Sequence, residues 1–298
     1  MEGRIIRGIA GFYYVQTDGL LYECKAKGLF RLDGIKPLVG DNCRIMPVEE
    51  SDPDPEALPV GNIVEILPRE NNLLRPAVAN VDQALIVFAI RDPEPNFGVL
   101  DTFLLRMELT QVPVILGFNK ADLDAEGQLQ QKITQIYAPT GYPMAFFSAK
   151  KRTGLEQIKA LLKGKTTALA GPSGAGKSSL INLMQKDVRM ETMSVSAKTQ
   201  RGRHTTRHSE LIPLEEGGYI CDTPGFTSLG SEGIDKEQIQ LGFREIGKWR
   251  GGCRFAQCSH ITEPDCSVRE KLQEGLISPE RYESYVRMYR ECESRKKF

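Results

Sequence analysis

Residues 171–178 read Gly171-Pro172-Ser173-Gly174-Ala175-Gly176-Lys177-Ser178, a glycine-rich loop that ends in lysine and serine. The apolar run before this loop, Thr166 to Ala170, is typical of a buried strand, and Ser179 to Met184 has the apolar spacing of a helix start. A strand, a glycine loop and a helix in this order allow backbone N–H groups and the helix N-terminus to hold phosphate. Lys177 is placed to reach the outer phosphates, and Ser178 is placed to coordinate a magnesium ion.

The composition fits a globular protein with two or three domains. The chain has 298 residues, and Lys plus Arg and Asp plus Glu both total 39. Because the net charge is balanced, any contact with nucleic acid must come from local clusters of basic residues. One cluster lies between Lys186 and Arg207, and the C-terminus forms another. The basic residues of this second cluster are Arg287, Arg290, Arg295, Lys296 and Lys297.

The cysteines and the apolar runs indicate a cytoplasmic protein without a membrane segment. Seven cysteines is an odd number, and Met1-Glu2-Gly3-Arg4 has no apolar secretory core, so we expect no disulfide framework. No apolar run approaches the roughly 20 residues that span a bilayer. Reduced thiols are then available to bind metal.

Residues 1 to 68 alternate short β-rich runs with turn signals, which is typical of a small antiparallel sheet or barrel. The expected strands are Arg4–Ile9, Phe12–Val15, Leu20–Cys24, Asn42–Met46 and Gly61–Ile66. Five short strands in this length predict a barrel of the oligonucleotide-binding type (OB-fold). Aromatic and basic residues could form a face for base stacking and phosphate contact, or the aromatic residues could instead fill the barrel. These residues are Tyr13, Tyr14, Phe30, Lys25, Lys27 and Arg31.

From residue 84 to residue 170, apolar runs alternate with helical patterns. The expected strands are Ala84–Ile90, Val112–Phe118, Met144–Phe147 and Thr166–Ala170. The expected helices are Leu100–Leu109, Gln128–Tyr137 and Gly154–Leu162. This alternation predicts a mostly parallel, doubly wound sheet, in which ligands bind beyond the carboxyl ends of the strands.

Two short motifs after neighbouring strands point to guanine. Asn119-Lys120-Ala121-Asp122 supplies a carboxylate that can accept from guanine N1–H and the 2-amino group, which adenine cannot match. We expect Asn119 and Asp122 to select the base and Lys120 to pack over it. In Ser148-Ala149-Lys150, a backbone N–H can donate to guanine O6.

Asp222-Thr223-Pro224-Gly225 ends a further expected strand, Gly218–Cys221. Asp222 can hold magnesium through water, and the Gly225 N–H can meet the γ-phosphate. Between this motif and the phosphate loop lies Arg201-Gly202-Arg203-His204-Thr205-Thr206-Arg207. One of its threonines should coordinate magnesium when GTP is bound. We favour Thr206, with Thr205 as the alternative.

These five pieces form the motif set of a GTPase, but the base-reading motifs precede the phosphate loop. The chain is therefore organised as a circularly permuted GTPase, whose pocket survives because strand neighbours, rather than chain ends, define it. The predicted GTP-binding residues are Asn119, Lys120, Ala121, Asp122, Ser148, Ala149, Lys150, Gly171, Pro172, Ser173, Gly174, Ala175, Gly176, Lys177, Ser178, Ser179, Asp222 and Gly225. The predicted magnesium ligands are Ser178, Thr206 and Asp222.

The C-terminal region is expected to be largely helical from Lys236 to Ile246, and it carries a cluster of metal-binding residue types after that stretch. Three cysteines and one histidine in short loops predict a closed tetrahedral zinc site. The predicted ligands are Cys253, Cys258, His260 and Cys266. Such a metal would supply folding energy that this segment lacks in apolar core. The other cysteines, Cys24, Cys43, Cys221 and Cys292, stand apart and are interpreted as structural.

The whole chain resembles the bacterial ribosome-small-subunit-dependent GTPases. The resemblance rests on the permuted motif order, on Gly202-Arg203-His204-Thr205-Thr206, on Asp222-Thr223-Pro224-Gly225 and on the spacing of the four zinc ligands. It implies an N-terminal barrel at 1–68, a GTPase domain at 71–228 and a zinc-binding domain at 229–298. It also implies slow GTP hydrolysis that the small ribosomal subunit stimulates, contact with its rRNA late in its maturation, and help in releasing another assembly factor. We expect a monomer.

The position after the Asp-Thr-Pro-Gly motif bears on mechanism. Many GTPases carry a water-orienting glutamine there, but this chain has Phe226, whose ring cannot orient water. Intrinsic hydrolysis should be slow, and His204 is the candidate for the missing group. The predicted catalytic residues are His204, Lys177, which reaches the phosphates, and Thr206, which coordinates magnesium. Alternatively, His204 contacts RNA or shapes its loop.

Two other functions fit parts of the sequence. One is an RNA-binding module whose affinity is set by the bound nucleotide. The other is a small-molecule kinase, although Asn119 and Asp122 of the guanine motif argue against it.

Overall fold

The structure is a computed structural model that describes residues 1–26, 30, 35–49, 57–74, 77–185, 209–222 and 233–295. These residues form two compact units, each described by itself below. The first includes Met1–Gln83, Lys159–Ala170 and residues 209–222, and the second includes Ala84–Ile158, Gly171–Ser179 and residues 233–295. Several residues named above lie outside the described ranges. They are Lys27, Arg31, the basic residues between Lys186 and Arg207, His204, Thr205, Thr206, Gly225, Phe226, Lys296 and Lys297.

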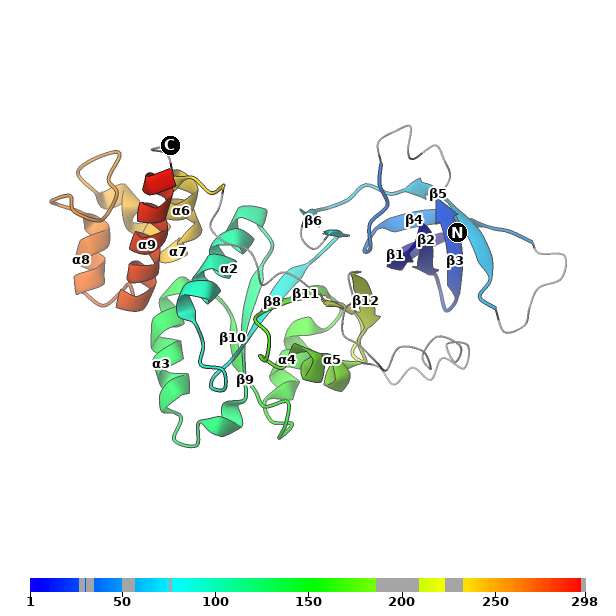
Figure 1. The fold of residues 1–298 in the computed structure, drawn as a ribbon, viewed down its shortest axis with the longest axis horizontal. Helices are drawn as coiled ribbons and strands as arrows, with labels where there is room; N and C mark the ends of the chain where they lie inside the picture. Colours follow the sequence, from blue (N-terminus) through cyan, green and yellow to red (C-terminus); the bar gives the residue numbers. More distant parts are fainter. Residues whose placement is uncertain are drawn as a thin grey trace. The chain divides into compact units, whose positions relative to one another are not determined.

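A five-stranded barrel forms the N-terminal part of the first unit (Figure 1). Its strands are β1 (Glu2–Ile9), β2 (Phe12–Gln16), β3 (Leu21–Ala26), β4 (Asn42–Pro47) and β5 (Val60–Ile66). They pair in the order β1-β2-β3-β5-β4, and β1 also pairs with β4, which closes the barrel. Alternate side chains along each strand fill the core, among them Ile5, Val15 and Ile63. The predicted barrel is confirmed.

The predicted stacking face of the barrel is only partly present. Phe30 belongs to the apolar core and Tyr13 packs against that core, so neither offers a free ring. The Tyr14 ring lies under the Arg7 guanidinium, 4.1 Å from its centroid, and its hydroxyl donates to Glu23. The interpretation that aromatic residues fill the barrel therefore holds for Phe30, because a phenyl ring at that point gains more from burial than from exposure.

Three further strands continue the sheet of the first unit. Strand β11 (Thr166–Ala170) pairs in parallel with β13 (Tyr219–Asp222), and β13 pairs antiparallel with β12 (Glu210–Pro213). Strand β12 then pairs with β1 of the barrel, where Arg7 lies opposite Glu210. A short hairpin of β6 (Asn72–Leu74) and β7 (Ala77–Ala79) was not expected from the sequence.

The second unit contains the parallel strands β8 (Gln83–Ala89), β9 (Val114–Asn119) and β10 (Met144–Phe146), in the order β10-β9-β8. Every residue of β8 and β9 is buried, as expected of parallel strands covered on both faces. The connecting helices are α2 (Phe97–Thr110), α3 (Gln128–Tyr137) and α4 (Leu155–Leu162), and α5 (Lys177–Met184) follows the phosphate loop. Short 3₁₀ helices occur at Ala121–Leu123 and Ala138–Thr140. These elements appear at nearly the predicted positions.

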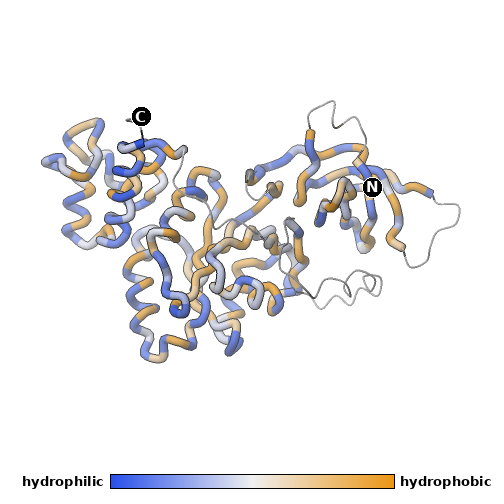
Figure 2. Tube along the Cα trace, in the orientation of Figure 1, coloured by the Kyte–Doolittle hydropathy of each residue, from blue (hydrophilic) through white to orange (hydrophobic). Residues whose placement is uncertain are grey.

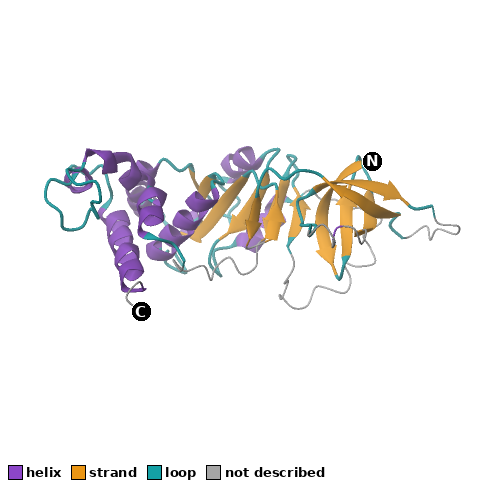
Figure 3. Cartoon of the chain, turned by 90° about the horizontal axis from the view of Figure 1, so that it is seen from above, coloured by secondary structure: helices purple, strands orange, loops and turns teal. Residues whose placement is uncertain are grey.

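The C-terminal region is helical, as Figure 3 shows by colour. Its helices are α6 (Lys236–Gly242), α7 (Arg244–Trp249), α8 (Ser267–Gln273) and α9 (Pro279–Arg295), with a 3₁₀ turn at Arg250–Gly252. The stretch predicted to be largely helical, Lys236 to Ile246, is confirmed as helical. It forms two helices, because Phe243 takes an extended conformation and its buried ring ends α6. Along these helices hydrophobic and hydrophilic residues alternate (Figure 2).

The apolar residues of this region form a substantial core. Ile239, Phe243, Tyr285 and Met288 are almost completely buried together. The expectation that this segment lacks an apolar core is therefore wrong. None of the helices among the described residues combines the length and the apolar character that a membrane crossing needs.

Candidate nucleotide and metal sites

The phosphate loop follows β11 and takes a conformation that only glycine adopts easily. Gly171, Gly174 and Gly176 all have positive φ angles, of 139°, 78° and 88°. A Cβ atom on Gly171 would collide with the Val87 carbonyl oxygen, so the loop lies against the end of β8. Lys177 begins α5, and its Nζ donates to the carbonyl oxygens of Gly171 (2.7 Å) and Pro172 (2.9 Å). The ammonium group thus lies within the loop, where phosphate oxygens would compete for it.

Asn119 ties three segments of the predicted nucleotide site together. Its side chain is 2% exposed, and Nδ2 donates to the Ala175 carbonyl oxygen in the phosphate loop (2.9 Å). Its Oδ1 accepts from the backbone N–H groups of Lys120 (2.7 Å) and Ala149 (3.0 Å). These bonds make Asn119 a brace between the motifs, and the contact with the base that the sequence predicts for it stays a prediction. Sequence reasoning missed this brace.

Asp122 and Ser148 form the second link of the base-reading region. Ser148 Oγ donates to Asp122 Oδ1 (2.5 Å) and accepts from the Lys151 N–H (3.0 Å). The Ser148 N–H donates to Thr153 and the Ala149 N–H to Asn119. Of the three N–H groups of residues 148–150, that of Lys150 is therefore the donor that the described residues leave for guanine O6.

Lys120 reaches a segment that the sequence did not single out. It has φ 63°, and its Nζ donates to the Asp92 carbonyl oxygen in the connection between β8 and α2. Pro93, the next residue, lies 3.4 Å from the point that a Cβ on Gly174 would occupy. Residues 91–95 therefore bind the base-reading motif through Asp92 and lie beside the phosphate loop at Pro93.

The predicted magnesium ligands are only partly described. Ser178 is exposed in the first turn of α5. Asp222 ends β13, opposite Leu169 on one side and Glu210 on the other. The Asp222 side chain, Thr205, Thr206, His204 and Gly225 lie outside what the structure describes.

The predicted zinc ligands come together in the C-terminal region. The ligand atoms of Cys253, Cys258, His260 and Cys266 all lie within 4.8 Å of one another. Cys253 Sγ is 3.8 Å from Cys266 Sγ, and His260 Nδ1 is 3.4 Å and 3.6 Å from these two sulfur atoms. A tetrahedral zinc with ordinary bond lengths needs about 3.8 Å between sulfurs and about 3.6 Å between sulfur and nitrogen. These side chains therefore have the spacing of a closed zinc site.

The electrostatics of this cluster also favour a cation. Burial raises the pKa of the Cys258 thiol to about 12, so a thiolate there needs a positive partner. Burial lowers the pKa of His260, which keeps its imidazole neutral and able to act as a ligand. The remaining cysteines, Cys24, Cys43, Cys221 and Cys292, are all buried outside the cluster.

Side chains of α6 and α9 hold the loop that carries the cluster, and sequence reasoning missed them. The carbonyl oxygens of residues 258, 259 and 260 accept, in order, from Gln240 Nε2 (2.8 Å), the Tyr285 hydroxyl (2.7 Å) and the Tyr282 hydroxyl (2.6 Å). The Glu263 carboxylate accepts from the N–H groups of residues 259, 261 and 262. Tyrosines at positions 282, 285 and 289 share one helix face, which is the signal that could have revealed this contact.

The comparisons with known proteins agree with this arrangement. The family model described as RsgA GTPase matches residues 66–232, and the model described as RsgA N-terminal domain matches residues 2–52. The chain belongs to the RsgA GTPase family. Like the members of this family, it is a GTPase that uses guanine nucleotide with Mg²⁺.

Relatives match the chain over its full length. A protein of Agathobacter rectalis, named small ribosomal subunit biogenesis GTPase RsgA, is 50% identical to this chain, and the match covers 100% of this chain and 100% of the relative. One of Caldanaerobacter subterraneus subsp. tengcongensis with the same name is 46% identical, with 100% of this chain and 97% of the relative covered.

Two solved structures share the fold. YloQ, described as a circularly permuted GTPase, has TM-score 0.77 at 33% identity, with 99% of this chain and 95% of YloQ covered. YjeQ from Thermotoga maritima has TM-score 0.79 at 34% identity, with 98% of both chains covered. The expected fold class, an α/β chain with an N-terminal barrel, a permuted GTPase and a helical C-terminal region with a Cys/His cluster, is confirmed.

Proposed function

We propose that this GTPase is an assembly factor that acts late in the maturation of the small ribosomal subunit. The observation that carries the nucleotide part of this proposal is the Asn119 side chain, which binds the phosphate loop and both base-reading segments into one site. The ribosomal part is supported by relatives of full length whose name is small ribosomal subunit biogenesis GTPase RsgA.

In the proposed site, Asp122 accepts from guanine N1–H and the 2-amino group, and the Lys150 N–H donates to O6. Ser148 fixes the Asp122 carboxylate at 2.5 Å, so the carboxylate is oriented before the base arrives. Adenine, with the opposite donor and acceptor pattern, leaves this carboxylate unpaired and is rejected. The residues proposed to bind GTP are those predicted from the sequence above.

Hydrolysis needs charge neutralisation and an oriented water molecule. Lys177 would neutralise charge on the outer phosphates, and Mg²⁺, held by Ser178, Thr206 and Asp222, would add to that neutralisation. Since Phe226 cannot orient water, we assign this role to His204, whose neutral imidazole can accept from the attacking water. The intrinsic rate is then slow, and the small ribosomal subunit raises it.

The remaining parts of the proposal concern partners and location. The barrel and the basic clusters would contact rRNA, and hydrolysis would help release another assembly factor. One structural zinc ion would occupy the Cys253, Cys258, His260 and Cys266 cluster, whose spacing fits it. We propose a cytoplasmic monomer with domains at 1–68, 71–228 and 229–298.

The test is phosphate release from GTP by the wild-type chain and by His204→Ala, with and without small ribosomal subunits. We expect the small subunit to stimulate the wild type, and large subunits, the matched control, to have no effect. In His204→Ala the stimulated rate should fall by about 10²-fold or more, with GTP binding unchanged. Absence of stimulation in the wild type would remove the ribosomal assignment, and normal stimulation of His204→Ala would remove His204 from the mechanism.

Phe226 also favours a second candidate, in which GTP only sets the affinity of the protein for RNA and hydrolysis permits release. The two candidates differ in their response to a non-hydrolysable GTP analogue. If this analogue supports repeated cycles of subunit maturation and release, gating by nucleotide is the function and hydrolysis is secondary. If maturation stops after one round, hydrolysis is required.

A further inference from the structure

Helix α2 presents one stripe of residues to the C-terminal helices. Positions 98, 101, 105 and 108 follow each other at spacings of three and four residues, so they lie along one face of the helix. Each meets a different residue of the C-terminal region, in order Arg287, Arg281, Gly242 and Arg244. Leu105 approaches Gly242 so closely that a Cβ on this glycine would collide with it.

The centre of this contact is a buried charge cluster. Arg281 is 1% exposed, and its NH1 donates to Asp101 Oδ1 of α2 at 2.7 Å. Its Nε and NH2 donate to the two carboxylate oxygens of Glu245 in α7, at 2.7 Å and 3.1 Å. Burial alone would lower the pKa of Arg281, but the two carboxylates raise it well above its usual value, so the guanidinium stays charged.

A cluster of this kind permits little movement. The Tyr137 hydroxyl also donates to Asp101 Oδ1, at 2.9 Å, and the Phe243 ring lies 4.4 Å from the guanidinium carbon of Arg281. Separating the partners is strongly unfavourable, because it would leave charges buried without compensation. Helices α2, α7 and α9 are therefore held in one geometry around Arg281.

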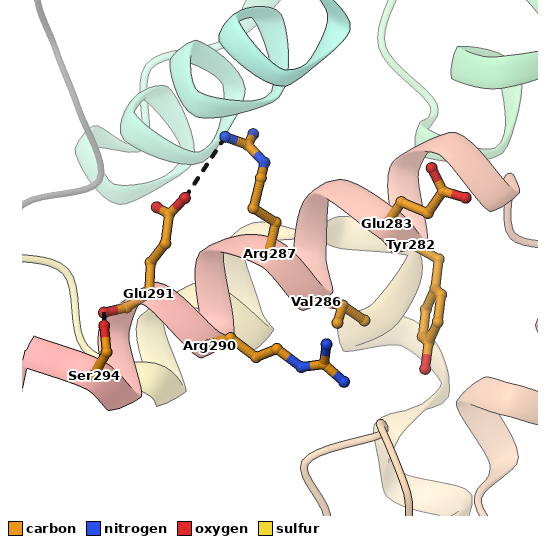
Figure 4. Close-up of a pocket in the computed structure, with 7 residues that line it drawn as sticks. All are labelled: Tyr282, Glu283, Val286, Arg287, Arg290, Glu291 and Ser294. Atoms are coloured by element: carbon orange, nitrogen blue, oxygen red, sulfur yellow. Dashed lines mark hydrogen bonds and ion pairs between the residues drawn. The ribbon is translucent and has the colours of Figure 1, made fainter.

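Two further contacts, one on each side of this charge cluster, join the C-terminal region to α2. Near its start, Arg287 NH2 donates to the Gly98 carbonyl oxygen at 3.3 Å. Figure 4 shows Arg287 pointing toward α2, whereas Arg290 points away from α2 into an open groove of about 610 Å³. Near the end of α2, Glu108 pairs with Arg244 at 2.7 Å and accepts from the Tyr142 hydroxyl at 2.9 Å.

The start of α2 leads directly to the nucleotide site. Asn96 caps the helix, with its Oδ1 accepting from the Val99 N–H at 3.1 Å. Residues 91–95 precede this cap. The Asp92 carbonyl oxygen accepts from Lys120, and Pro93 Cδ lies 3.4 Å from the position that a Cβ on Gly174 would occupy. A shift of the first turn of α2 would therefore move a segment that is bonded to the base-reading motif and lies beside the phosphate loop.

We propose that α9 holds residues 91–95 against the nucleotide site through α2 and thereby slows the release of guanine nucleotide. Arg281, Asp101 and Arg287 are positioning residues, since they contact one another or α2 and are not among the residues proposed to bind GTP. The inference rests on the nucleotide site proposed above. The C-terminal region thus affects nucleotide release through its contacts with α2.

The test is the dissociation rate of a fluorescent GDP analogue, measured beside the urea unfolding midpoint. Asp101→Asn keeps the shape of the side chain and removes its charge, and Arg287→Ala removes a contact made by a side chain that is 50% exposed. We expect release to become about five-fold faster or more in each variant, the lower end of coupling between sites. Arg287→Ala should release the analogue faster while its urea unfolding midpoint stays at the wild-type value. A residue with a merely structural role would not speed release without lowering that midpoint.

Arg290→Ala is the matched control on the same helix, and it should release the analogue at the wild-type rate. Wild-type release from folded Asp101→Asn and Arg287→Ala would overturn the proposal, as would equally fast release from Arg290→Ala. Asp122→Ala separates the two levels of inference. If it loses guanine binding while Asp101→Asn behaves as wild type, only the positioning role fails. If Asp122→Ala binds normally, the nucleotide site itself is wrong.

Discussion

Gly176 is the residue on which the nucleotide site depends most closely. Its φ of 88° lies where side chains rarely fit, and a Cβ atom there would collide with Asn119 Nδ2. That nitrogen donates to the Ala175 carbonyl oxygen and is part of the brace between the phosphate loop and the base-reading segments. A single methyl group at position 176 therefore opposes both the loop conformation and the brace.

We expect Gly176→Ala to weaken GDP binding by about ten-fold or more, because losing one buried hydrogen bond and adopting a strained φ each cost about 1 kcal/mol. Gly127→Ala is a matched control, since Gly127 has φ 72° and its Cβ would meet nothing within 4 Å. It should lose about 1 kcal/mol of stability and bind GDP normally. Titration with a fluorescent GDP analogue and urea unfolding measure both effects. Equal affinity in Gly176→Ala and the wild type would show that the brace is not needed.

The strands and the metal cluster could be predicted from the sequence because their signals are local. Strand β11 and helix α3 have the predicted bounds, since each depends on apolar spacing within a few residues. The buried pair of Arg281 and Asp101 joins residues 180 positions apart, and no local pattern announces it. The boundary between α6 and α7 at Phe243 could not be predicted for a related reason. The burial of the Phe243 ring outweighed the helical spacing of the residues around it.

The loop of the metal cluster depends on Glu263. Although burial by itself raises the pKa of Glu263, hydrogen bonds from Ser259 and neighbouring N–H groups lower it to about 2. Because this pKa is below that of an unfolded glutamate, the carboxylate stabilises the fold above about pH 4.5. Its contribution decreases between that pH and pH 2, as the folded protein takes up the proton.

We expect Glu263→Gln to lower the free energy of unfolding by about 1 kcal/mol at pH 7, a value reduced for partial solvent screening. The difference from the wild type should persist at pH 5 and shrink by pH 3. Urea unfolding in the presence of a chelator isolates this effect from metal binding. Glu274→Gln is the control, because among the described residues the Glu274 side chain pairs with Lys271 at the surface, and the change should matter by less than about 0.5 kcal/mol. A difference between Glu263→Gln and the wild type that grows as the pH falls would contradict the assignment.

At the scale of the molecule, the C-terminal region has two sources of stability. Its apolar core includes Leu105 of α2, so this core extends into the helix that starts at the nucleotide site. Its Cys/His cluster, with the spacing of a zinc site, lies in the loop between α7 and α8, and Tyr282 and Tyr285 connect that loop to α9. Removal of metal should therefore loosen the loop while the helices stay folded.

Zinc removal tests whether the apolar core stabilises the helices and the metal stabilises the loop. We expect about one zinc ion per wild-type chain, and a loss of about 3–4 kcal/mol in the stability of the C-terminal region on chelation, the mass-action gain from tight binding. Cys258→Ser should lose the zinc and the sensitivity to chelator, whereas Cys292→Ser, a buried cysteine outside the cluster, should keep both. Metal analysis, far-UV circular dichroism and urea unfolding measure these effects. Because the apolar core remains, the helical signal should survive chelation at 25 °C; its complete loss would mean that the metal, rather than the core around Phe243 and Tyr285, folds this region.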